Sequence, residues 1–251
     1  MRSIPTTVEG VEAWLVDAPL TRVEVSREFP PPLTARGADA WARQRADNPR
    51  LFDGPILAAL GYDASDDTLR VLARRDGFAR LVVQPMVPTG VRLLALTAVL
   101  VARDAVGREH VLLGQRGTGT RIYDGLWELG PSGGIDPPPA GVEVMDLPMI
   151  MARLADEIAE EIGPELARRV AGAPARVVAI TRDHLAFADD LCIRVDLGDL
   201  SAVADLAHPA NWEYRQTLWL PIDTYVAWED PAKVIPPTRA LARALGWVGG
   251  A

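Results

Sequence analysis

The chain has 251 residues, of which 49% are hydrophobic and 24% are charged, and its formal net charge is −8. This composition is typical of a soluble globular protein, and the length allows one large domain or a main domain with a smaller companion. The negative charge argues against a nucleic-acid partner, because binding to a duplex usually needs a basic surface. A single cysteine, Cys192, excludes an internal disulfide framework and is typical of a reducing cytoplasm.

Residues 1–90 are predicted to form a small N-terminal α+β module. Short alternating stretches over 13–29 predict strands that end at the prolines 30–32, and residues 35–49 have the spacing of a helix. Residues 56–78 predict two strands joined by a turn at 63–67.

Residues 91–251 are predicted to form a second domain. Residues 92–117 predict a hairpin that turns at 105–107, and its longest apolar run, 93–102, is only about half a membrane span. Neither this run nor the N-terminal stretch predicts a membrane segment or an export signal, so we expect a cytoplasmic protein without a membrane partner. Further strands are predicted at 126–129, 176–183, 191–197 and 217–223, and helices at 145–163 and 236–247. This mixed order predicts an α/β (α+β) fold.

The predicted helix 145–163 is rich in carboxylates. Its apolar residues form a stripe that we expect to face the core, with the glutamates on the opposite side. The stripe consists of Met149, Ala152, Ala155, Ile158, Ala159 and Ile162. Glu157, Glu160 and Glu161 would share one side of the helix, where a divalent cation that prefers oxygen ligands could offset their mutual repulsion. A solvated acidic face is the alternative interpretation.

The stretch from Glu157 to Gly163 resembles the second half of a Nudix box. Gly133 and Gly134 match the opening glycines of that motif, and residues 112–116 are similar to the strand that precedes it in the family. The resemblance implies the Nudix fold, a mixed β-sheet sandwiched between helices. It also implies hydrolysis of the diphosphate bond of a nucleoside diphosphate linked to another group.

The box departs from the family pattern in several places. The segment from Gly134 to Glu157 is about eight residues longer than the pattern, and Asp156 replaces the expected arginine. The early glutamate of the box has no aligned partner, although Glu143 and Asp146 are nearby. Arg153, one turn before Glu157, could reach that carboxylate in place of the missing arginine.

A segment outside the box points to one branch of the family. Trp41, Arg45 and residues 49–53, which include Phe52 and Asp53, are similar to the N-terminal module of UDP-sugar pyrophosphatase-like Nudix proteins. This likeness implies that UDP-glucose, or a similar nucleotide sugar, is cut to UMP and a sugar 1-phosphate.

The resemblance also implies the site residues. Glu157, Glu160 and Glu161 would hold Mg²⁺, for which Mn²⁺ can substitute, and a carbonyl of Gly133 or Gly134 would complete the shell. A glutamate from a later loop often assists in this family, and Glu213 is the candidate, with Asp189 and Asp190 as rivals. Three arginines are candidates for phosphate binding, and Phe52 and Asp53 for the rest of the substrate. The arginines are Arg116, Arg121 and Arg182.

Two alternatives stay open. The same chemistry could act on ADP-ribose, coenzyme A or a dinucleotide, since no local feature fixes the base. The missing arginine and early glutamate would instead suit a Nudix-fold regulatory protein that binds nucleotides with little turnover. In each case the expected partner is a small-molecule nucleotide, and homodimer formation is left open.

Overall fold

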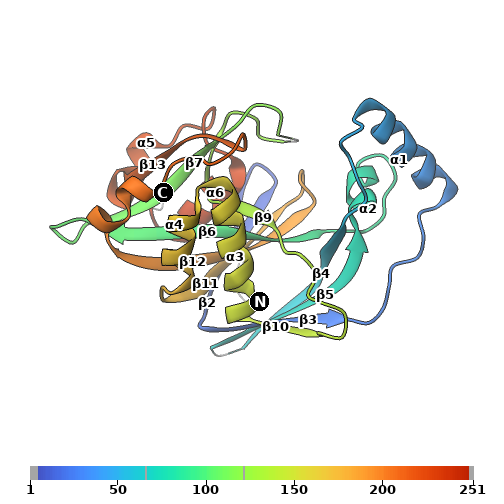
Figure 1. The fold of residues 1–251 in the computed structure, drawn as a ribbon, viewed down its shortest axis with the longest axis horizontal. Coiled ribbons are helices and arrows are strands. Elements are labelled where there is room, and N and C mark those ends of the chain that lie inside the picture. The colour runs from blue at the N-terminus through green and yellow to red at the C-terminus, as the bar shows by residue number, and fades with distance from the viewer. Residues whose placement is uncertain (1–4, 66, 121, 249–251) are drawn as a thin grey trace.

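A computed structural model describes residues 5–65, 67–120 and 122–248 (Figure 1). In these residues the strands form one mixed sheet with the order β1-β2-β11-β12-β6-β4-β5-β3-β10, while β7, β8, β9 and β13 pair beside that path. The predicted α+β class with a mixed sheet is therefore confirmed. The strands are β1 Thr6–Val8, β2 Val11–Ala18, β3 Leu20–Ser26, β4 Pro55–Ser65, β5 Thr68–Gly77, β6 Leu93–Arg103, β7 Glu109–Arg116, β8 Trp127–Leu129, β9 Ser132–Gly134, β10 Val144–Asp146, β11 Ala175–Asp183, β12 Ala188–Asp199 and β13 Tyr214–Pro221.

The three helices predicted from the sequence are present, and others were not foreseen. The helix that begins at Pro164 was missed because a proline after a glycine indicates a stop, although proline is also favoured in the first turn of a helix. No helix in the described part of the chain is long and apolar enough to cross a bilayer. The helices are α1 Ala35–Asp47, α2 Phe78–Val83, α3 Leu147–Glu161, α4 Pro164–Ala171, α5 Tyr225–Trp228 and α6 Pro236–Ala244, with short 3₁₀ turns at Leu200–Ala202, Ala204–Leu206 and Ile222–Thr224.

The central strand β6 is buried on both faces, which explains its continuous apolar sequence. Leu96 and Leu100 pack into the core that includes α3 and α4, whereas Val99 and Val101 pack with α5 and α6. Because successive side chains of a strand point to opposite faces, the sheet lies between two helical layers. The predicted sandwich of sheet and helices is thus present.

Helix α3 is rotated relative to the sequence prediction. Its buried face consists of Ile150, Met151, Leu154, Ile158 and Glu161, and Ala152 of the predicted stripe is exposed. The predicted stripe is confirmed at Ile158 and Ile162, which are buried, and at Met149 and Ala159, which pack against the core, whereas Ala152 is exposed. The three glutamates do not all face away from the core, because Glu161 is buried. Burying isoleucine and leucine removes more apolar surface from water than burying alanine, so the larger side chains determine the orientation.

The long segment between β9 and α3 crosses to the N-terminal strands. Strand β10 pairs antiparallel with β3, and the Arg75 guanidinium donates to the carbonyls of Pro138 at 2.7 Å and Pro139 at 3.1 Å. Asp146 ends β10 and also caps α3, because its carboxylate accepts the Met149 N–H at 3.0 Å. The extra residues therefore connect the start of α3 to the other end of the sheet.

Hydrogen bonding continues through the predicted domain boundary near residue 90. Strand β2 pairs with β11, and β4 pairs with β6 at the Ala58–Leu93 bridge. The division into residues 1–90 and 91–251 stays a prediction, and the sheet itself shows no break there.

Candidate functional site

Three carboxyl groups crowd together where α3 ends. Glu157 and Glu161 come from α3, and Glu213 comes from the loop before β13. Burial and repulsion from Glu160 raise the pKa of Glu157 to about 7. Burial, together with hydrogen bonding to and repulsion from Glu213, raises the pKa of Glu161 to about 10. The group therefore needs protons or a cation to be stable at neutral pH. Glu160 is exposed on the same helix.

Backbone hydrogen bonds position Glu213. The Ala210 N–H donates to the Glu161 carbonyl at 2.8 Å, which fixes this loop on the last turn of α3. The Gly117 N–H donates to the Glu213 carbonyl at 2.6 Å, and a Cβ at Gly117 would collide with the Trp212 carbonyl. Gly117 is therefore the residue that lets the two loops approach so closely.

The two glycines of β9 face different neighbours. A Cβ on Gly133 would lie 2.7 Å from Cδ of Glu157, so the carboxylate packs directly on the bare backbone. A Cβ on Gly134 would instead meet Leu93 Cδ1 at 3.3 Å. Gly133 is thus required for the position of Glu157, while Gly134 lies at the border between the acidic cleft and a cavity described below.

A buried glutamate that the sequence did not single out lies beside this group. Glu128 of β8 is 2% exposed and accepts hydrogen bonds from Arg116 at 2.7 and 2.8 Å, from Tyr214 at 2.7 Å and from Ser132 at 3.3 Å. Burial raises the pKa of Glu128 despite these donors. A charged residue between two apolar residues in a three-residue strand was the only signal available. Arg116, predicted to bind phosphate, lies at the site but is paired with Glu128.

An open acidic cleft lies on the outer side of α3. It is lined by Arg153, Asp156, Glu157, Glu160 and Asp136, of which Asp136 was not predicted. Arg153 does not pair with Glu157 as proposed from the sequence. Its Nη1 lies 3.3 Å from Oδ2 of Asp156, the residue that replaces the expected box arginine.

The structure does not bring the remaining predicted residues to this group. Arg182 pairs with Asp189 at 2.8 Å, because alternation along β11 points it to the opposite face from Thr181 and Asp183. Asp189 is occupied by Arg182 and by Arg92, so it does not compete with Glu213.

Three further predicted positions lie elsewhere. Phe52 is 74% exposed and lies outside the acidic cleft and the cavity, and the Asp53 carboxylate accepts the Ala79 N–H at 2.8 Å near the start of α2. Arg121 lies outside the described residues. Of the residues near the missing early glutamate, Glu143 pairs with Arg27, and Asp146 caps α3.

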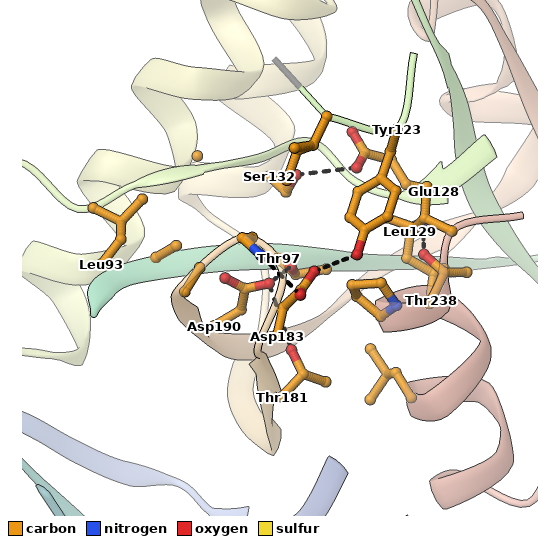
Figure 2. Close-up of a pocket in the computed structure, with 18 of the residues that line it drawn as sticks. Leu93, Thr97, Tyr123, Glu128, Leu129, Ser132, Thr181, Asp183, Asp190 and Thr238 are labelled. Atoms are coloured by element: carbon orange, nitrogen blue, oxygen red, sulfur yellow. Dashed lines mark hydrogen bonds between the residues drawn. The ribbon is translucent and has the colours of Figure 1, made fainter. Parts of the chain in front are cut away.

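A cavity of about 170 Å³ adjoins the acidic group (Figure 2). Apolar side chains such as Leu93, Leu129 and Leu241 form its walls. Figure 2 shows the carboxylates of Asp183 and Asp190 side by side at its floor, with Tyr123 and Glu128 across from them. The cavity is also lined by the polar residues Thr97, Thr181, Ser132 and Thr238.

The two carboxylates at the cavity floor, Asp183 and Asp190, differ in the hydrogen bonds that they accept. Asp183 accepts hydrogen bonds from the Tyr123 hydroxyl at 2.7 Å and from the Leu185 and Ala186 N–H groups at 2.7 and 2.9 Å. Asp190 accepts only from Thr97 and Thr181, at 3.2 and 3.4 Å, among the described residues. Burial and repulsion from Asp183 raise the pKa of Asp190 to about 7.

The acidic group has the chemistry of a divalent-cation site but not yet the geometry. Within the described residues, no three histidine, cysteine or acidic side chains already converge as a metal-binding set. The donors are nevertheless hard oxygen ligands, and burial and mutual repulsion raise the pKa values of Glu157 and Glu161. No arginine or lysine among the described residues forms an ion pair with either carboxylate. The chemistry of these oxygen donors therefore suits Mg²⁺ or Mn²⁺.

No family model matches the chain, and no curated protein matches it. Solved structures with partial likeness include a Nudix hydrolase from M. smegmatis, with 17% identity over 61% of this chain and 83% of that chain. A MutT protein from Methanosarcina mazei Go1 has 18% identity over 61% of this chain and 91% of that chain. A Nudix hydrolase from Alicyclobacillus acidocaldarius has 18% identity over 61% and 90%. The TM-score is 0.38 in all three cases.

Proposed function

We propose that the protein is a Nudix-type hydrolase that uses a divalent cation to cut the diphosphate bond of a nucleoside diphosphate linked to another group. One observation carries the proposal: Glu157 and Glu161, from the stretch that resembles the box, meet Glu213 in a crowded carboxyl group that forms no ion pair with an arginine or lysine of the described residues. A diphosphate brings further negative charge, so a cation is needed for substrate and protein to come together.

Glu157 and Glu161 would hold Mg²⁺, for which Mn²⁺ can substitute. The exposed Glu160 and the β9 backbone at Gly134 would contribute from the rim. When bound, the cation would neutralise phosphoryl charge and lower the pKa of a coordinated water.

The chain's own residues would act on either side of this position. Glu213 is the candidate to accept a proton from the attacking water, because it approaches Glu161 from a different loop and forms no ion pair with an arginine of the described residues. Arg153 is the candidate for a direct phosphate contact, because its guanidinium is partly exposed in the cleft. Arg116 would instead act indirectly by holding Glu128 in place.

A nucleotide sugar such as UDP-glucose is the first substrate to test, with ADP-ribose, coenzyme A and dinucleotides as alternatives. Support for the UDP-sugar branch comes from residues 41–53 alone, and within that segment Phe52 and Asp53 lie away from the acidic group. Cytoplasmic location and homodimer formation stay predictions.

The test is hydrolysis of this panel by the purified protein with Mg²⁺, beside a Glu160→Gln/Glu161→Gln variant. We expect release of a nucleoside monophosphate that depends on the cation and is lost in the variant. No product from any substrate would contradict the enzyme proposal and leave the regulatory alternative. Product from the variant at the wild-type rate would place the chemistry elsewhere.

A further inference from the structure

The cavity beside the acidic group is built by alternate residues of neighbouring strands. Thr181 of β11 lies opposite Asp190 of β12, Asp190 lies opposite Ala95 of β6, and Ala95 lies opposite Gly134 of β9. One row of paired residues thus runs across the sheet from the cavity floor to Gly134, which also borders the acidic cleft. A ligand with its diphosphate at the cleft therefore has a neighbouring space for another of its parts.

The volume limits what that part is. About 170 Å³ is less than the roughly 300–1,000 Å³ typical of pockets for whole drug-sized ligands. The walls come from Leu93, Leu129, Ile235 and Leu241, so the space favours a flat apolar ring over a sugar with many hydroxyl groups.

The floor of the cavity demands hydrogen-bond donors from its ligand. Both hydroxyl groups that reach Asp190 donate to the same oxygen, Oδ2, and no described residue donates to Oδ1. Asp183 beside it is already saturated by Tyr123 and two backbone N–H groups. A ligand carbonyl placed against the ionised Asp190 would meet a second acceptor, whereas an amino group would satisfy the oxygen.

We propose that this cavity binds the base of the nucleotide and selects a base with an exocyclic amino group, which donates to Asp190. This inference rests on the proposed function and narrows its substrate class. It disfavours uracil, which carries a carbonyl at the position where cytosine carries its amino group and offers only the ring N3–H as a donor, and hence disfavours UDP-sugars.

Neutral nucleosides test the inference without any metal or hydrolysis. Cytidine and uridine form one matched pair, and adenosine and inosine form another, because an amino group replaces a carbonyl within each pair. Above about pH 8, where Asp190 is ionised, we expect calorimetry to show the amino member of each pair binding about tenfold more tightly or better, as for a hydrogen bond to a charged group. Equal affinity within both pairs, tighter binding of uridine and inosine, or no binding of any nucleoside would overturn the inference.

Substitutions assign the effect to the cavity floor. In Asp190→Asn the side-chain amide can donate to a carbonyl, so the preference within each pair should fall below about threefold or reverse. The exposed Asp205→Asn changes charge equally and should leave the preference unchanged. Retention of the full preference in a folded Asp190→Asn would overturn the inference.

A second variant keeps the test decisive if Asp190→Asn fails to fold. Ala188→Leu adds bulk to the cavity lining without removing a charge, and we expect it to abolish nucleoside binding. Unchanged binding would place the base elsewhere. Failure of the proposed function is distinguishable, because absence of hydrolysis with intact nucleoside preference would contradict the enzyme and leave the base cavity standing.

Discussion

Nη1 of Arg153 lies 3.3 Å from Oδ2 of Asp156 on the outer side of α3, at the cleft that Glu157 also lines. Asp156 stands where the Nudix box has an arginine, and Arg153 precedes it by one turn. The pair therefore places the guanidinium of Arg153 beside the position where the family pattern has an arginine.

Arg153→Ala should lower kcat/KM by about tenfold, because it removes the partly exposed cation of the cleft, and a loss of about 1.4 kcal/mol has this effect. Asp156→Ala should change kcat/KM by less than about threefold, since it leaves the guanidinium free to reach phosphate. Both variants should unfold within about 1 kcal/mol of the wild type, as expected for an exposed pair. Steady-state kinetics with the reverse order would assign the site role to Asp156.

The adjacent glycines of β9 provide a matched pair of variants. Gly133→Ala places a methyl group 2.7 Å from Cδ of Glu157 and must displace that carboxylate, whereas Gly134→Ala meets the flexible end of Leu93 at 3.3 Å. We expect Gly133→Ala to weaken Mg²⁺ binding by about 10- to 100-fold, the range seen when the supports of metal ligands are removed. Gly134→Ala should bind Mg²⁺ nearly normally. Calorimetric titration measures both, and equal affinities would show that Glu157 is not a ligand.

The crowded carboxyl groups predict how stability depends on pH. The folded-state pKa of Glu161, about 10, and that of Glu157, about 7, both exceed the ordinary glutamate pKa of 4.5. At a pH between 4.5 and the folded-state pKa of each group, the folded protein holds a proton that the unfolded chain has lost. The stability that these protonated groups provide is therefore full below about pH 4.5 and is lost as the pH rises through the folded-state pKa values. The melting temperature of the metal-free protein should fall from pH 5 to pH 9.

Two measurements separate this effect from general alkaline destabilisation. Glu161→Gln cannot lose a proton, so its melting temperature should fall less steeply over the same range. Mg²⁺ should raise the wild-type melting temperature more at pH 8.5 than at pH 6, because the cation replaces protons. A parallel decline in wild type and variant would mean that Glu161 is ionised throughout.

Removing one partner of the buried pair Arg116 and Glu128 should destabilise the fold more than replacing both partners with uncharged residues. Arg116→Ala leaves a buried carboxylate with only hydroxyl donors and should destabilise the fold by about 3–5 kcal/mol. The double variant Arg116→Met/Glu128→Gln removes both charges and should be less destabilised than Arg116→Ala. Urea unfolding compares them, and additive losses would show that the two side chains do not depend on each other.

Sequence patterns predicted the elements of this fold better than the directions of its side chains. The hairpin of β6 and β7 and the acidic helix follow from period and turn residues, because both signals are local. The burial of Glu161 was missed because the choice of stripe counted alanines equally with Ile150 and Leu154, which determine how α3 packs.

The candidate site was predictable where its residues share one local motif. Glu157 and Glu161 belong to the one stretch that resembles the box, while Glu128 joins the group only because β8 pairs with β7 and brings it to Arg116. Arg182 could have been rejected from the alternation of β11 alone, had the face of Thr181 been known. Which distant strands pair, and to which face of the sheet their side chains point, is determined by the assembled sheet and cannot be deduced from one sequence.

The segment of extra residues makes the N-terminal strands part of the support for the acidic helix. Among the described strands, β10 pairs with β3 alone; it passes directly into α3 at Asp146, and Arg75 of β5 holds the preceding turn. A shortened protein that starts at residue 91 would retain every box residue yet lose the partner of β10 and the Arg75 contacts. The carboxylates of α3 would then lack the anchor that sets where the helix begins, so the insertion makes a motif within the second half of the chain dependent on its first half.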